Sequence, residues 1–255
     1  MSFMKRGNLI MKSIKKKVFG LLITSTLVAV APFSAQAKGN EVHNKEKHKI
    51  DYVALGDSLA AGQTPYHQYD KSYPDYLVKR FEQSQYGVSY DNFGVSGYTS
   101  ENLKNDILNN PEVQDEIKKA NLITIDIGAN DLLAKLKTDP AHVTDSLMTV
   151  ANNLQVILQT IDSLNPNVQV LVMGYYNPFP HYSQEQQASL LPLLEALNKT
   201  IEDRSIANGD KYVPMTQVIE KNEEQYVPNP EDIHLNLKGY QVVAKEFWKN
   251  IDKLE

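Results

Sequence analysis

The sequence predicts an α/β fold, a three-layer α/β/α sandwich around a mostly parallel central sheet of about five strands. Two observations predict it. Short apolar segments rich in β-branched residues alternate with longer segments of helical periodicity, which is the pattern of consecutive βαβ units. Several of the apolar segments also end at glycine-containing turns, and open α/β sheets bind their ligands at that edge.

The first half of the chain supplies the first strands of this sheet. Residues 50–55 are apolar and β-prone and stop at Gly56. A helix is expected next at 74–83, because Pro74 suits a first helical turn and apolar side chains follow at helical spacing. The remaining elements of this half are a strand at 88–93, helices at 99–109 and 111–119, and a strongly β-branched strand at 122–127.

The second half continues the alternation. A long amphipathic helix is expected over 140–164, followed by an apolar strand at 168–173. The series ends with a long helix, a short strand and a last helix, at 185–207, 211–213 and 237–251. No internal repeat, low-complexity tract or interdomain linker interrupts the series, so a single domain is predicted over 50–255.

The N-terminus predicts export. Several lysines precede an apolar run at residues 18–33, and the run closes at Ala35-Gln36-Ala37, which fits a small-x-small cleavage site. We therefore expect a signal peptide over 1–37, cleaved after Ala37, and an extracellular protein. An uncleaved membrane anchor is the alternative, although the run is shorter than the roughly 20 residues that span a bilayer. The start codon is either Met1 or Met11.

Composition limits the remaining properties. The chain has no cysteine, which excludes disulfides and cysteine-based metal sites. Its formal net charge of −5 disfavours nucleic acid as a partner. Residues 38–49 are polar and charged, and we expect them to form a flexible leader. We also expect a monomer with no stable membrane insertion after cleavage.

Ser58 follows the first predicted strand directly, at the ligand-binding edge of the sheet. A serine hydroxyl is a weak nucleophile at neutral pH, so it needs an imidazole within hydrogen-bond reach, usually oriented by a carboxylate. Among the six histidines, His234 is the one whose loop offers neighbouring carboxylates, Glu231 and Asp232. We therefore expect Ser58 and His234 to meet; the alternative is that Ser58 only helps to cap a helix.

Two further strand ends carry hydrogen-bond donors. Gly97 lies in the turn after the second predicted strand, where glycine lets the backbone approach a ligand closely. Asn130 has a side-chain amide just after the third. Both residue types are also common in turns for backbone reasons alone. Asp57 and Asp131 lie beside these candidates, and we expect them to hold their loops by hydrogen bonds.

Taken in order, four short blocks resemble the SGNH hydrolase superfamily, the GDSL esterases and lipases. The blocks are Gly56-Asp57-Ser58-Leu59, residues 92–97, Gly128-Ala129-Asn130-Asp131 and Asp232-Ile233-His234. The resemblance runs from about residue 51 to the C-terminal helix and implies a flavodoxin-like sheet. It also implies Ser58 as nucleophile and His234 as general base, with no metal or cofactor. The oxyanion hole would then comprise the backbone amides of Ser58 and Gly97 and the side chain of Asn130.

One position departs from the family pattern. The family places an Asp three residues before the His, whereas here that residue is Glu231 and Asp232 comes only two before. We favour Asp232 as the acid that orients His234, with Glu231 as the alternative. A third option is that a backbone carbonyl orients the ring.

The expected function is hydrolysis of carboxylic esters by a secreted serine esterase or lipase, with a small-acyl or lysophospholipid-like substrate. Removal of O-acetyl groups from a cell-wall or plant polysaccharide is the alternative, and a catalytically silent binding module is a third hypothesis. Two aromatic loops, 60–73 and 175–182, are candidates for substrate specificity because both follow strands at the edge that carries the site.

Overall fold

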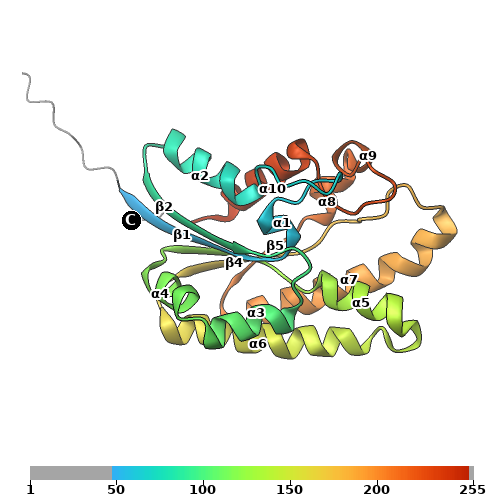
Figure 1. Cartoon of the computed structure of the whole chain (residues 1–255), viewed down its shortest axis with the longest axis horizontal. Helices are drawn as coiled ribbons and strands as arrows, with labels where there is room; N and C mark the ends of the chain where they lie inside the picture. Colours follow the sequence, from blue (N-terminus) through green and yellow to red (C-terminus); the bar gives the residue numbers. More distant parts are fainter. Residues whose placement is uncertain (1–47, 253–255) are drawn as a thin grey trace, which may run out of the picture. The chain divides into compact units, whose positions relative to one another are not determined.

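Five parallel strands form one sheet at the centre of the computed structural model, in the order β2-β1-β3-β4-β5 (Figure 1). The structure describes residues 48–252. The strands are β1 (Lys49–Gly56), β2 (Gly87–Gly94), β3 (Leu122–Asp126), β4 (Gln169–Met173) and β5 (Lys211–Val213). Every neighbouring pair is parallel, so the predicted α/β fold with a central parallel sheet is confirmed.

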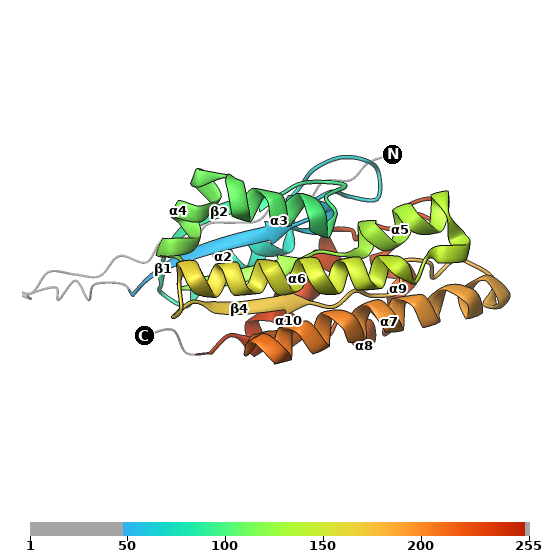
Figure 2. The same cartoon turned by 90° about the horizontal axis from the view of Figure 1, so that it is seen from below.

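Helices cover both faces of this sheet, as Figure 1 and Figure 2 show. On one face α2 packs against α10, and on the other α6 packs against α3, α4 and α7. The helices are α1 (Ser58–Ala61), α2 (Tyr73–Gln83), α3 (Ser100–Asn109), α4 (Pro111–Lys119), α5 (Ala129–Thr138), α6 (Asp145–Leu164), α7 (Gln184–Asn208), α8 (Thr216–Glu220), α9 (Glu223–Tyr226) and α10 (Leu237–Asn250). The arrangement has the three layers that the sequence predicts.

Burial follows the position of each strand in the sheet. All residues of the central strand β3 are buried, and β1 beside it is buried from Tyr52 to its end. Strands that are covered on both faces have continuous apolar sequences, which is why β1 and β3 could be predicted from the sequence. The edge strand β2 has no fully buried residue and accordingly carries polar side chains.

The segment after β3 differs from the sequence prediction. Helix α5, which the sequence did not predict, begins directly after Gly128, whose backbone adopts φ +118°. The helix predicted over 140–164 begins later, because Pro140–His142 forms a 3-10 turn and α6 starts at Asp145. Pro140 lacks the N–H needed to continue α5, so the chain makes two helices with a turn between them.

The carboxyl ends of three strands lie side by side. Gly56 at the end of β1 is paired with Gly94 of β2 on one side and with Asp126 of β3 on the other. Because the strands are parallel, the loops that follow them emerge at the same edge of the sheet. This edge brings together segments that are far apart in the sequence.

The predicted signal peptide, and the polar leader as far as residue 47, lie outside the described residues. The first strand begins at Lys49. Between residues 48 and 252, no helix combines the length and the apolar character that a membrane crossing requires.

Candidate active site

Ser58 is the first residue of α1, immediately beyond the turn that ends β1. Gly56 lies so close to β3 that a Cβ there would be 2.6 Å from the Asp126 carboxyl carbon, and only glycine fits. Asp57 then caps α1 by accepting the Leu59 N–H at 3.0 Å. The turn is thereby fixed, and it presents Ser58 at the edge of the sheet.

Ser58, His234 and Asp232 form a continuous chain of hydrogen bonds. The Ser58 Oγ lies 2.7 Å from His234 Nε2, and His234 Nδ1 lies 2.7 Å from Asp232 Oδ1. Ser58 and His234 are buried, and the Asp232 side chain is only 5% exposed. An imidazole held between a hydroxyl and a carboxylate is the arrangement that activates a serine as a nucleophile.

Asp232, and not Glu231, is the carboxylate hydrogen-bonded to the imidazole. Glu231 is exposed, and its side chain has no hydrogen bond or ion pair with any residue in the range 48–252. The backbone N–H of His234 also donates to Asp232 Oδ1, at 2.8 Å. The Asp232 side chain therefore folds back over its own loop, which lets it reach the ring across a spacing of two residues.

Two neighbouring segments hold the loop that carries His234. The Tyr176 hydroxyl donates to the carbonyl of Ile233 at 2.8 Å. From the other side His67 Nδ1 lies 3.6 Å from Asp232 Oδ2, although the His67 side chain is 80% exposed. The turn that carries His67 therefore folds back over the loop that carries His234.

The predicted oxyanion donors have different surroundings. The backbone amides of Ser58 and Gly97 have no hydrogen-bond partner among the described residues, and Gly97 adopts φ +84° in an exposed turn. Asn130 lines a cavity together with Ser58 and His234 and donates one amide hydrogen to the Tyr98 carbonyl at 2.8 Å. A primary amide carries two hydrogens, so the second is available to a substrate oxygen.

Two buried carboxyls lie beneath the serine turn. The Asp126 Oδ2 accepts the backbone N–H of Asp57 at 3.2 Å, its Oδ1 accepts the Tyr73 hydroxyl at 2.6 Å, and Asp57 accepts the Tyr175 hydroxyl at 2.7 Å. Burial raises the pKa of both carboxyls, and the nearby Asp57 charge raises the pKa of Asp126 further. Both carboxyls therefore hold a proton to a higher pH than an ordinary aspartate, and the rise in pKa is the larger for Asp126.

The expectation that Asp57 and Asp131 hold loops is confirmed. Asp57 joins α1 to the loop after β4 through the hydrogen bonds described above. Asp131 accepts both the backbone N–H of Ser100 at 2.8 Å and its hydroxyl at 2.6 Å. These bonds tie the turn after β3 to the start of α3, and so fix Asn130 between them.

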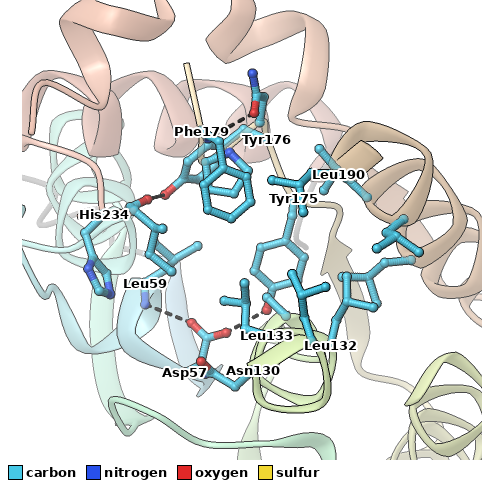
Figure 3. Close-up of a pocket in the computed structure, with 18 of the residues that line it drawn as sticks. Asp57, Leu59, Asn130, Leu132, Leu133, Tyr175, Tyr176, Phe179, Leu190 and His234 are labelled. Carbon is cyan, nitrogen blue, oxygen red and sulfur yellow. Dashed lines mark hydrogen bonds between the residues drawn. The ribbon is translucent and has the colours of Figure 1, made fainter. Parts of the chain in front are cut away.

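An apolar pocket opens beside Ser58 and His234 (Figure 3). Tyr175, Tyr176 and Phe179, from the predicted specificity loop at 175–182, form one part of its wall. Leucines of α5 and α7 form most of the rest, namely Leu132, Leu133, Leu136, Leu190, Leu191, Leu193, Leu194 and Leu197, and the wall is completed by Leu59, Ala129, Asn177, Pro178 and Ile233. The other predicted loop, 60–73, contributes no residue to this wall.

Helices α5 and α7 both contribute leucines to the apolar pocket. Figure 2 shows both helices extending past the ends of the strands, and Figure 3 shows Leu132 and Leu190 on the far side of the cavity from His234. Asp57, Ser58, Asn130 and His234 supply polar groups at the near end. A pocket with a polar end and an apolar wall suits a ligand that has one polar group and one apolar part.

Comparison with known proteins identifies the family of the chain. Residues 54–242 match the GDSL-like lipase/acylhydrolase family. The chain is 24% identical over 262 residues to the uncharacterized protein YpmR of Bacillus subtilis, covering 94% of this chain and 97% of that protein. It is 27% identical over 207 residues to the spore germination lipase LipC of Bacillus licheniformis, covering 77% of this chain and 94% of LipC.

Among solved structures, the lipase Lip_vut3 from a goat rumen metagenome aligns with a TM-score of 0.69 and 23% identity. The alignment covers 82% of this chain and 100% of that one, which supports the same fold. The family match includes Ser58, Gly97, Asn130 and His234. The chain therefore belongs to the GDSL-like lipase/acylhydrolase family within the SGNH hydrolases, and it is an ester-hydrolysing enzyme.

Proposed function

We propose that the enzyme hydrolyses carboxylic esters of aliphatic acyl chains, with Ser58 as nucleophile, His234 as base and Asp232 as the orienting acid. One observation carries this proposal. The Ser58 Oγ and His234 Nε2 lie 2.7 Å apart at the end of a pocket whose other walls are leucine and aromatic side chains. The reactive atoms thus adjoin a space that suits a hydrocarbon chain.

The mechanism follows from these positions. His234 Nε2 accepts the hydroxyl proton as Ser58 Oγ attacks the ester carbonyl, and the carbonyl electrons move onto its oxygen. Asp232 holds the ring through Nδ1 and stabilises the imidazolium. His234 then returns the proton to the leaving alcohol, which leaves an acyl group on Ser58. Water, deprotonated by His234 in the same way, attacks this acyl group, and Ser58 departs with the proton.

The oxyanion of each tetrahedral intermediate needs donors that are already in place. The free amides of Ser58 and Gly97 and the second amide hydrogen of Asn130 are the donors we assign to it. The Asn130 side chain is held by its bond to Tyr98 and by the loop ties around it, so it does not have to reorganise during the reaction.

The wall of the apolar pocket favours a lysophospholipid-like or other aliphatic ester over an acetylated polysaccharide. An acetyl group has a single methyl to bury, which would leave the leucines of α5 and α7 without a partner. Each methylene of a longer chain that is buried there contributes about 0.8 kcal/mol to binding. A polysaccharide would also need many polar groups around the acetyl, and the pocket wall beyond its near end offers almost none.

The test is hydrolysis of p-nitrophenyl esters from acetate to palmitate by the protein starting at Lys38, with Ser58→Ala as the control. We expect serine-dependent turnover that rises from acetate toward the longer chains, and labelling of Ser58 by a fluorophosphonate. Turnover confined to acetate would favour the polysaccharide alternative. Neither turnover nor labelling would favour the binding module.

The same proposal includes export and action as a monomer. The lysines, the apolar run at 18–33 and the Ala35-Gln36-Ala37 sequence support cleavage after Ala37. Ser58, Asp232 and His234 come from one chain, so the reaction needs no residue from a second copy.

A further inference from the structure

Within the described residues, five of the nine large apolar side chains that remain exposed lie on loops at the carboxyl edge of the sheet or, for Leu237, at the start of α10. Within residues 48–252 these are Tyr66, Tyr69, Val95, Tyr182 and Leu237, which we call the apolar rim. The other exposed large apolar side chains in that range lie on helices α3, α6 and α7 and are Leu108, Met148, Val156 and Ile206. The rim therefore gathers around the end of the molecule that carries Ser58.

Three members of the rim are tied directly to the site. The Val95 amide donates to the carbonyl of Gly56, in the serine turn, at 3.1 Å. The Tyr182 ring stacks on Phe179, a wall residue of the apolar pocket, with ring centroids 4.8 Å apart. Leu237 opens α10, just beyond the histidine loop. These three residues therefore belong to segments that adjoin the serine turn, the pocket wall and the histidine loop.

The two remaining members, Tyr66 and Tyr69, lie on a hairpin that is held in place. Tyr69 forms a β-bridge with Gln63, and the Tyr240 hydroxyl donates to the Gln63 carbonyl at 2.6 Å. The Asn229 side chain adds a bond of 2.7 Å from the histidine loop to the hairpin. Tyr66 is nevertheless 65% exposed and Tyr69 64%. A fixed backbone that presents exposed aromatic rings loses little conformational entropy on binding a partner.

The chemistry of the rim indicates a lipid surface as that partner. Tyrosine places an apolar ring and a hydroxyl at the boundary between water and hydrocarbon, where this residue type is enriched. The aliphatic members Val95 and Leu237 have no polar group to offer a sugar. The hairpin carries one acidic and one basic residue at its end, Asp70 and Lys71, so it has no excess of positive charge for an anionic polymer.

We propose that the apolar rim binds the surface of a lipid aggregate and passes single ester molecules from it into the apolar pocket. This inference rests on the proposed function, because it assigns the source of the substrate for the same Ser58. The rim makes the hydrolysis of aggregated esters faster than their monomer concentration allows. Hydrolysis of a soluble short-chain ester does not need it.

The test compares the double variant Tyr66→Ser/Tyr69→Ser with the matched control Met148→Ser/Ile206→Ser, which removes equally exposed apolar groups from α6 and α7. Each protein is assayed for co-sedimentation with phosphatidylcholine vesicles and for hydrolysis of a long-chain ester above its critical micelle concentration. Hydrolysis of monomeric p-nitrophenyl butyrate is measured in parallel. Neither tyrosine lines the apolar pocket.

We expect the tyrosine variant to lose at least about tenfold in vesicle binding and in turnover of the micellar ester, with butyrate turnover within about twofold of the wild type. The control variant should retain vesicle binding, turnover of the micellar ester and turnover of butyrate. Equal vesicle binding by both variants would overturn the inference, as would tyrosine-dependent binding to an insoluble polysaccharide in place of vesicles. Absence of Ser58-dependent butyrate hydrolysis in the wild type would instead refute the proposed function.

Discussion

Asp232 accepts two hydrogen bonds from His234 through a single oxygen, one from ring Nδ1 at 2.7 Å and one from the backbone N–H at 2.8 Å. The backbone bond fixes the loop, and the side-chain bond fixes the rotation of the ring within it. Nε2 is then directed at Ser58, and the Gln63 side-chain nitrogen also lies 3.5 Å from Nδ1. The shortened spacing between acid and base thus produces a well-defined geometry.

This geometry predicts different effects for the two neighbouring carboxylates. Asp232→Asn should lower kcat/KM for a p-nitrophenyl ester by about a hundredfold or more, because the amide no longer stabilises the imidazolium. Glu231→Gln should change kcat/KM by less than about twofold, since Glu231 is exposed. Steady-state kinetics of both variants measure this difference. If both variants lost only a little kcat/KM, and by the same factor, a backbone group would be the one that orients the His234 ring.

Asn130→Ala should lower kcat by about a hundredfold to a thousandfold with a much smaller change in KM. The Asn130 amide would act on the oxyanion, which forms only after attack, so its loss affects the transition state more than substrate binding. Kinetics on a soluble ester give both constants. A thermal melt should be run alongside, because the variant also loses the bond to Tyr98. A rise in KM alone would contradict the assignment.

Leu136→Trp should shorten the preferred acyl chain. Leu136 lies on the α5 side of the apolar pocket, and an indole there occupies space that a long chain would use. We expect turnover of p-nitrophenyl palmitate to fall at least about tenfold relative to acetate. Leu108→Trp, at an exposed position on α3, is the matched control and should keep the wild-type profile. An unchanged profile in Leu136→Trp would place the acyl chain elsewhere.

The Asp210 carboxyl makes the free energy of unfolding decrease as the pH rises. Burial raises its pKa from 3.8 to about 6. A carboxyl with a raised pKa in the folded chain adds stability at low pH, and this contribution is lost as the pH rises toward about 6. Asp210→Asn should therefore raise the free energy of unfolding by about 1 kcal/mol at pH 7, allowing for solvent screening, and leave it unchanged near pH 4. Urea unfolding at both pH values measures this, and a difference of the same size at both would refute it.

Export predicts a defined N-terminus. Expression of the full chain in a bacterium with a general secretion pathway should release a protein into the medium or periplasm that begins at Lys38. Ala37→Glu should block cleavage, because the enzyme that removes signal peptides needs a small residue there. N-terminal sequencing of the released protein identifies the cut. Retention of the uncleaved wild type in the membrane would favour the anchor.

The sheet and the position of the serine were predictable because they depend on short-range patterns. Buried parallel strands are apolar along their whole length, and Gly56 ends the first of them where Ser58 begins the next element. Spacing alone could not choose between Asp232 and Glu231. That choice depends on how one loop folds back on itself, and no periodicity in the sequence records it.

The apolar pocket was only partly predictable. The loop at 175–182 was identified by its aromatic residues, but the leucines of α5 and α7 were not. In a helix, an apolar stripe shows that one face avoids water, and it does not show whether protein or ligand covers that face. Helix α5 was missed for a second reason, because Gly128-Ala129-Asn130-Asp131 has the composition of a turn.

The 176 positions that separate Ser58 from His234 have a consequence for biosynthesis. Ser58 lies just beyond β1, a strand that pairs on both sides with segments translated later, and His234, the base in the proposed mechanism, follows β5. A chain synthesised only as far as α7 therefore holds Ser58 without His234, and in the proposed mechanism it has no base to activate the hydroxyl. In the proposed mechanism, esterase activity therefore requires synthesis to have passed His234, so activity reports that the loop carrying this histidine has been made and placed beside Ser58.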